Sequence, residues 1–147
     1  MTKITLYLTP ELEEALRKDI PDTGLPGGNI IDCMASQAIY QLNLHYGLIP
    51  KNTLSPAELQ KKVLEEFGEY LKTNPSGEFD INAASKTYRD LDMTCGGRPA
   101  ATKALLGRVI AKAVHAGQFP VKVEQVYLKN GAPKRSTGNR AALYQLV

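Results

Sequence analysis

Basic residues in the last third of the chain have the types and spacing that bind a polyanion. Residues 98–147 hold nine Lys or Arg and a single acid, Glu124, which gives a net charge of +8. Residues 1–97 hold nine Lys or Arg and fourteen Asp or Glu, which gives a net charge of −5. This asymmetry is typical of a protein that binds nucleic acid. The alternative is that the positive segment only aids solubility or packs against the acidic part of the chain.

One group of these basic residues lies on a helix that we expect over residues 99–116. Apolar residues recur at helical spacing and are expected to face inward: Leu105, Leu106, Val109, Ile110, Ala113 and Val114. The opposite face carries Arg108 and Lys112 between small residues, so this helix can approach a phosphate backbone or a groove closely. Arginine can bond a guanine edge or a phosphate with two N–H groups, whereas lysine acts as a point charge. Lys103 at the edge of this face and Arg98 in the preceding turn are the other expected DNA contacts of this first group. An ordinary solvated amphipathic helix would show the same pattern.

A second group lies in the loop between two expected strands, residues 121–127 and 142–147. This loop, residues 129–140, is rich in Gly, Pro and Asn, as in a β-hairpin. It carries four basic residues: Lys129, Lys134, Arg135 and Arg140. A flexible cationic hairpin beside a cationic helix suits contact with the DNA backbone and minor groove. The helix and the loop together predict a surface that binds duplex DNA.

Other residue types that could do chemistry form no recognised catalytic or metal motif. His45 and His115 are far apart in the sequence and have no Cys or carboxylate at metal-ligand spacing. Cys33 lies in an apolar helix and is expected in a core, and Cys95 has no base near it in the sequence. The chain has no phosphate-binding glycine loop, nucleophile elbow or His-Glu-x-x-His motif. We therefore expect no catalytic residues, no metal and no cofactor.

The N-terminal residues predict a strand followed by two helices. Residues 3–8 alternate between polar and apolar side chains, which is the period of a half-buried strand. Thr9-Pro10-Glu11 is a helix start, with Thr9 as N-cap. Asn29 is the expected cap of a second helix that runs to about Tyr46. This second helix is apolar on two sides, which implies that a partner chain or a second domain covers it.

This strand and these two helices resemble the ribbon-helix-helix family, over about a third of the chain. In that family two chains pair their first strands into an antiparallel ribbon that enters the major groove. The resemblance implies that Lys3, Thr5 and Tyr7 face DNA, while the alternate apolar residues form the dimer core. It also implies that the amide end of the second helix, at Asn29, binds a phosphate. Residues 1–50 have a net charge of −3, so a ribbon that only dimerises fits as well as one that reads DNA.

From residue 55 onward the expected order is helix, short strand, helix, helix and two strands. The capping box Ser55–Glu58 opens the first helix. Residues 78–81 are the expected short strand, and residues 82–91 are the expected second helix. This order is similar to the winged helix-turn-helix family, in which the third helix lies in the major groove and the wing touches the DNA backbone. The similarity implies these roles for the helix over residues 99–116 and for the basic loop.

Residues 77–147 are also similar to an uncharacterised bacterial domain of unknown function. The motifs that carry this similarity are Gly77-Glu78-Phe79, Leu106-Gly107-Arg108, Gly117-Gln118-Phe119-Pro120 and Asn139-Arg140-Ala141-Ala142-Leu143-Tyr144. The similarity implies a shared architecture and brings no established activity.

Length and composition allow one ordinary domain or two very small ones. The chain has 147 residues, of which 43% are hydrophobic and 22% are charged, so it can form a core. No apolar run approaches the roughly 20 residues that span a bilayer. The short apolar stretch before Pro10 is not typical of a signal peptide, and two cysteines make no disulfide framework. We expect a cytoplasmic α+β protein, mainly helical, that does not contact a membrane.

These features predict a dimeric DNA-binding protein that is not an enzyme, either a transcriptional regulator or a plasmid or phage maintenance regulator. The expected parts are a ribbon-helix-helix-like dimerisation segment (residues 1–47), a linker (48–54) and a winged-helix-like domain (55–147). The alternative is a protein-interaction module, such as an inhibitor encoded by a phage or plasmid. A third interpretation is a small enzyme that acts through Cys95 or His115.

Overall fold

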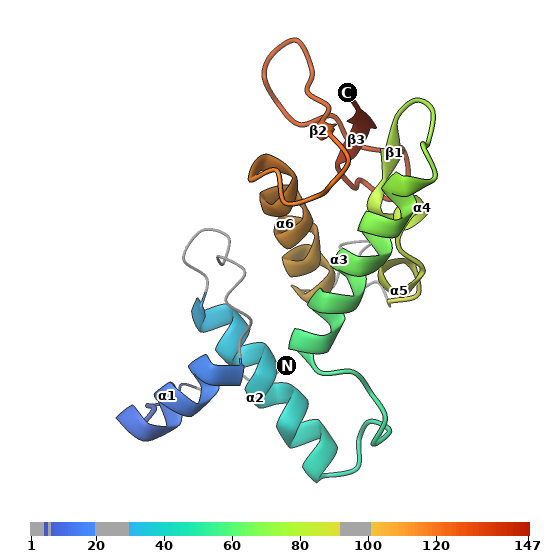
Figure 1. The fold of residues 1–147 in the computed structure, drawn as a ribbon. Coiled ribbons are helices and arrows are strands. Elements are labelled where there is room, and N and C mark those ends of the chain that lie inside the picture. The colour runs from blue at the N-terminus through green and yellow to red at the C-terminus, as the bar shows by residue number, and fades with distance from the viewer. Residues whose placement is uncertain (1–4, 6, 20–29, 92–100) are drawn as a thin grey trace. The chain divides into compact units, whose positions relative to one another are not determined.

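The computed structural model describes residues 5, 7–19, 30–91 and 101–147, and these residues form an α+β fold (Figure 1). The chain divides into two compact units, an N-terminal unit, Met1–Ala57, and a C-terminal unit, Glu58–Val147. This boundary falls shortly after the predicted linker. None of the helices in the described ranges is long and apolar enough to cross a membrane.

The N-terminal unit contains two helices that contact each other, α1 (Pro10–Asp19) and α2 (Ile30–His45). Thr9 caps α1 as predicted, because its hydroxyl accepts a hydrogen bond of 3.3 Å from the main-chain N–H of Leu12. The end of α2 also agrees with the prediction. It lies just before Gly47, whose φ of 65° is in the left-handed region that favours glycine.

The predicted N-terminal strand, residues 3–8, is not a strand where the structure describes it. Thr5, Tyr7 and Leu8 lie in no strand, and the rest of this segment, including Lys3, is outside the described residues. A strand needs a neighbour for its N–H and C=O groups. The described part of the N-terminal unit contains no second strand.

The C-terminal unit follows the predicted order of elements, with one difference. Its elements are α3 (Pro56–Lys72), β1 (Phe79–Asp80), α4 (Ile81–Ala84), α5 (Lys86–Arg89), α6 (Ala101–His115), β2 (Val123–Gln125) and β3 (Leu143–Leu146). The first two residues of α3, Pro56 and Ala57, are the last of the N-terminal unit. The strands form an antiparallel sheet in the order β1-β3-β2, so the last strand lies in the middle. In this register Tyr144 of β3 is opposite both Phe79 of β1 and Gln125 of β2.

The difference is that the predicted helix over residues 82–91 is two short helices, α4 and α5. The Asp80 carboxylate accepts a hydrogen bond of 3.0 Å from the N–H of Ala83 and begins α4. The Ser85 hydroxyl accepts a hydrogen bond of 3.0 Å from the N–H of Tyr88 and begins α5. Short polar side chains favour such cap positions because they bond the free N–H groups at a helix start.

Glu66 of α3 holds the start of α5 in place. Its carboxylate accepts hydrogen bonds from the Ser85 hydroxyl, from the main-chain N–H of Thr87 at 3.0 Å and from the Thr87 hydroxyl at 2.7 Å. Burial would raise the pKa of Glu66, but these bonds to its ionised form lower the pKa below the ordinary 4.5. An ionised side chain of α3 therefore connects α3 to α5.

The core of the C-terminal unit lies between α3, α6 and the sheet (Figure 1). Phe67 of α3 is fully buried, and its ring centre lies 5.1 Å from that of Phe119, 5.5 Å from that of Tyr144 and 6.0 Å from that of Phe79. Three residues of α6 belong to the same cluster: Leu106, Ile110 and Val114. This packing fixes the rotation of α6 about its axis, and so decides which of its residues face solvent.

Candidate nucleic-acid interface

α6 has one buried apolar face and one face of small and basic residues. All the residues predicted to face inward are buried: Leu105, Leu106, Val109, Ile110, Ala113 and Val114. On the opposite face Ala104 and Arg108 are exposed, whereas Gly107 and Ala111 are half-buried. The apolar periodicity of the sequence thus predicted the orientation of α6 correctly.

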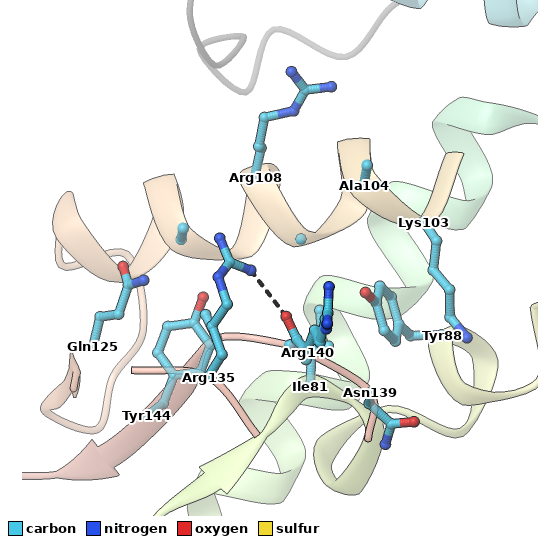
Figure 2. Close-up of a pocket in the computed structure, with 14 residues that line it drawn as sticks. Ile81, Tyr88, Lys103, Ala104, Arg108, Gln125, Arg135, Asn139, Arg140 and Tyr144 are labelled. Atoms are coloured by element: carbon cyan, nitrogen blue, oxygen red, sulfur yellow. Dashed lines mark hydrogen bonds between the residues drawn. The ribbon is translucent and has the colours of Figure 1, made fainter. Parts of the chain in front are cut away.

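A pocket of about 460 Å³ lies between this face of α6 and the loop that joins β2 to β3 (Figure 2). We call it the basic pocket. It is lined by Ile81, Tyr88, Lys103, Ala104, Gly107, Arg108, Ala111, Gln125, Arg135, Asn139, Arg140, Ala141, Ala142 and Tyr144. Four of these residues are basic and none is acidic, so the pocket favours an anion.

The loop between β2 and β3 folds into two successive turns. Gly131 lies in the first and Gly138 in the second, with φ of 83° and 88°, conformations that are open to glycine. The segment between the turns forms hydrogen bonds with the chain before the loop and with the chain after it. The main-chain N–H of Lys134 donates a bond of 2.8 Å to the carbonyl of Val126, and the carbonyl of Lys134 accepts a bond of 3.0 Å from the N–H of Leu143. The four basic residues of the loop therefore do not share one hairpin tip.

Arg135 and Arg140 come together at the second turn. One terminal nitrogen of Arg135, Nη1, donates a hydrogen bond of 2.9 Å to the main-chain carbonyl of Arg140 (Figure 2). A guanidinium has five N–H donors, so most of the donors of Arg135 remain for a ligand. Among the described residues, no carboxylate forms an ion pair with either arginine. Both arginines line the basic pocket.

The two lysines of the loop, Lys129 and Lys134, are not among the residues that line the basic pocket. The ammonium of Lys134 is 2.8 Å from the carboxylate of Glu78, so an acid of the same chain balances its charge. Glu78 precedes Lys134 by 56 residues, and the prediction of Lys134 as a DNA contact did not anticipate this pair. Lys129 is exposed near the first turn.

Arg108 and Lys112 lie on α6 as predicted, but they do not converge with the loop arginines. Arg108 is exposed and extends away from Arg135 and Arg140 (Figure 2). Lys112 is half-buried. α6 therefore contributes one outward-reaching cation, Arg108, at the rim of the basic pocket.

Lys103 is buried, rather than at the edge of an exposed face. It is 5% exposed, and its Nζ donates a hydrogen bond of 3.0 Å to the carbonyl of Leu91. The same nitrogen lies 5.0 Å from the centre of the Tyr88 ring. Periodicity does not anticipate this arrangement, because the aliphatic stem of a lysine can be buried while its ammonium reaches a distant oxygen. The Leu91 carbonyl and the Tyr88 ring of the same chain thus stabilise the charge of Lys103.

The remaining predicted contacts lie elsewhere in the chain. Arg98, Lys3 and Asn29 are outside the described residues. Thr5 and Tyr7 belong to the N-terminal unit and are exposed, Tyr7 to 95%.

The sequence analysis missed four polar residues of the basic pocket: Tyr88, Gln125, Asn139 and Tyr144. Burial raises the pKa of Tyr88 and of Tyr144, so both hydroxyls stay protonated at neutral pH and add no negative charge. The amides of Gln125 and Asn139 can each donate and accept hydrogen bonds. Two of these residues, Asn139 and Tyr144, are the first and last residues of the Asn139–Tyr144 motif in the sequence, so that motif could have indicated them.

His115, at the end of α6, forms a small polar cluster with the start of the loop. Its Nε2 is 3.0 Å from Oε1 of Gln125 and 2.9 Å from the hydroxyl of Tyr127. These bonds connect the end of α6 to the chain that leaves β2, which positions one wall of the basic pocket. Within the described ranges, no three His, Cys, Asp or Glu side chains gather where they could hold a metal ion.

Comparison of the chain with protein-family models, with curated proteins and with solved structures finds no match. The function is therefore inferred from the charge and geometry of the chain itself.

Proposed function

We propose that the chain is a non-enzymatic DNA-binding protein whose C-terminal unit binds duplex DNA as a winged helix. The observation that carries this proposal is that Arg135 and Arg140 of the loop line one pocket with residues of α6, and that none of the described lining residues is acidic. The order of elements also supports it, with α4 and α5 together in the place of the second helix. α6 then follows as the third helix, and β2, β3 and their loop form the wing.

In this proposal α6 enters the major groove. That groove is about 12 Å wide and admits an α-helix, and the exposed residue Ala104 is small, so α6 can come close to the bases there. Arg108 reaches outward from this face and can bond a guanine edge or a phosphate. Arg135, Arg140 and Lys129 on the loop bind flanking phosphates, which supply most of the affinity.

We also propose that the N-terminal unit joins two chains into a homodimer. Ile39, Leu42 and Tyr46 are exposed to 58%, 53% and 70%. Residues at these spacings lie on one face at the end of α2, so they form one apolar stripe. A stripe of this kind is typical of a protein interface. A homodimer would place two copies of α6 on two DNA half-sites.

A salt series tests DNA binding. Fluorescence anisotropy of a labelled duplex, titrated with the full chain, gives the association constant at each salt concentration. Each phosphate neutralised contributes about −0.9 to the slope of log K against log salt, so about five contacts give a slope of about −4.5. Absence of binding at low salt, or binding that salt does not weaken, would contradict the proposal.

The exposed stripe of α2 also favours a second candidate, a protein-interaction module that inhibits another protein. In that case the apolar stripe would form the centre of the surface that binds the other protein. The net charge of −3 over residues 1–50 would favour a partner with a basic surface. A pull-down separates the two candidates. A stoichiometric partner that stays bound after nuclease treatment, with no duplex binding in the titration, would favour the inhibitor.

A further inference from the structure

The basic pocket has the size and the chemistry of a small-molecule site. Its volume of about 460 Å³ lies within the range of roughly 300–1,000 Å³ that is typical of ligand pockets. We propose that it binds a phosphorylated ligand of about the size of a nucleoside monophosphate, and that this ligand competes with DNA. The competition rests on the proposed function, whereas the binding of the ligand does not.

Arg135 and Arg140 form the end of the pocket that holds the phosphate. The bond from Arg135 to the Arg140 carbonyl fixes the turn that carries both side chains. Figure 2 shows Arg135 extending from the loop toward α6, across the space of the pocket. Arginine forms paired hydrogen bonds to phosphate oxygens. Two arginines with no described carboxylate partner can thus neutralise a phosphate dianion.

The α6 side of the pocket is kept open by small residues. Ala104, Gly107 and Ala111 line it. A glycine inside a helix costs about 1 kcal/mol relative to alanine, and a Cβ at Gly107 would make only ordinary contact, 3.9 Å from the Tyr88 hydroxyl. Space for a Cβ is therefore available, and the backbone does not require glycine there. Because Gly107 has no side chain, room remains between α6 and the loop.

Two further cations line the pocket, but the ammonium of Lys103 bonds the carbonyl of Leu91 and Arg108 extends away from the loop arginines (Figure 2). The neutral residues of the lining suit the uncharged part of a nucleoside. Gln125 and Asn139 present amides, and Tyr88 presents a hydroxyl, so the pocket holds both donors and acceptors. Apolar atoms of Ile81 and Ala142 complete it. A cationic end joined to neutral polar and apolar groups matches a nucleoside phosphate better than a bare inorganic anion.

Competition follows from the shared use of the two arginines. The proposed DNA interface assigns Arg135 and Arg140 to backbone phosphates, and the same donors cannot serve both ligands at once. A ligand in the pocket should therefore weaken DNA binding, and DNA should weaken binding of the ligand by the same factor.

Calorimetric titration of the full chain with AMP tests the pocket, with adenosine as the matched probe without phosphate. We expect saturable binding of AMP, and binding of adenosine at least about tenfold weaker, because the phosphate supplies the charge-assisted bonds. Absence of AMP binding, or equal binding of AMP and adenosine, would overturn the proposal.

Two variants locate the bound AMP. The double variant Arg135→Ala/Arg140→Ala should lose at least about tenfold in AMP affinity. Ala104→Leu keeps every charge and the helical propensity of α6 but fills the pocket, and it should cause a similar loss. Lys122→Ala removes an exposed cation just before β2 and outside the pocket, and it should stay within about twofold of the wild-type chain. Wild-type AMP affinity in Ala104→Leu would overturn the assignment even if the arginine variant unfolds.

An anisotropy experiment with bound duplex separates the pocket from the proposed function. AMP should displace the duplex from the wild-type chain, and adenosine should not. If AMP binds as expected but no duplex does, the pocket stands and the DNA proposal falls. If the duplex binds but AMP does not, the pocket proposal falls. AMP that binds without displacing the duplex would overturn the competition.

Discussion

The Nη1 atom of Arg135 donates a hydrogen bond of 2.9 Å to the main-chain carbonyl of Arg140. Arg140 has a φ of 53°, in the left-handed region that few residues other than glycine adopt. The turn between them is closed by a bond of 2.8 Å from the N–H of Ser136 to the carbonyl of Ala141. One guanidinium thus stabilises the turn that carries the other, and both line the same pocket.

The ion pair between Lys134 and Glu78 should contribute little to stability. Its side chains are 41% and 35% exposed, and pairs of this kind contribute about 0–1 kcal/mol. Lys134→Ala should therefore lower the free energy of unfolding in urea by at most about 1 kcal/mol. It should also weaken duplex binding less than Arg135→Ala does. A loss of duplex affinity as large as that of Arg135→Ala would show that Lys134 is itself a DNA contact.

Glu66 should make the stability of the chain depend on pH below its ordinary pKa of 4.5. Because the pKa of Glu66 is lower in the folded chain, its ionised form stabilises the fold above pH 4.5. As the pH falls further, the unfolded chain takes up this proton first and the stabilisation is lost. In urea unfolding at about pH 6 and about pH 4, the loss between the two should be smaller in Glu66→Gln than in the wild-type chain.

Glu65→Gln, which also removes one carboxylate from α3, is the control for the Glu66 measurement. Its side chain is exposed, and no bond to α5 depends on it. Equal loss of stability in Glu66→Gln and in the wild-type chain would contradict the role given to Glu66.

The apolar stripe of α2 should hold the homodimer together. Leu42→Glu places a charge in the middle of the stripe, where its burial against a partner is costly. Sedimentation should show a dimer for the wild-type chain and a monomer for Leu42→Glu, with the helical circular dichroism unchanged. Gln41→Glu introduces the same charge at the exposed neighbouring position and should remain a dimer. A wild-type monomer, or a dimeric Leu42→Glu, would contradict the proposed interface.

Local patterns predicted the elements of the C-terminal unit well. The period of apolar residues in α6 gave its buried face, and the capping box gave the start of α3. The break at Ser85 was missed because the spacing of apolar residues carries no information on which hydroxyl bonds which N–H. The N-terminal strand was predicted from alternation alone, but a strand also needs a neighbour to pair with.

The candidate site was predicted in part, because it depends on contacts between distant segments. The sequence placed basic residues on α6 and on the loop, and Arg108, Arg135 and Arg140 all line the pocket. It could not show that Lys134 bonds Glu78 or that the ammonium of Lys103 bonds the carbonyl of Leu91. Both pairings satisfy a cation within the chain, and neither follows from a local pattern.

Charge reversal on α6 and on the loop tests duplex binding by this surface most directly. The measurement compares duplex affinity, by anisotropy at low salt, in Arg108→Glu/Arg135→Glu and in Lys61→Glu/Lys62→Glu. The second variant makes the same change of charge at exposed positions of α3. We predict that each of the two reversed arginines lowers the duplex affinity of the first variant by at least about tenfold. The second variant should stay within about threefold of the wild-type chain. Equal losses in the two variants, or no loss in the first, would contradict the account.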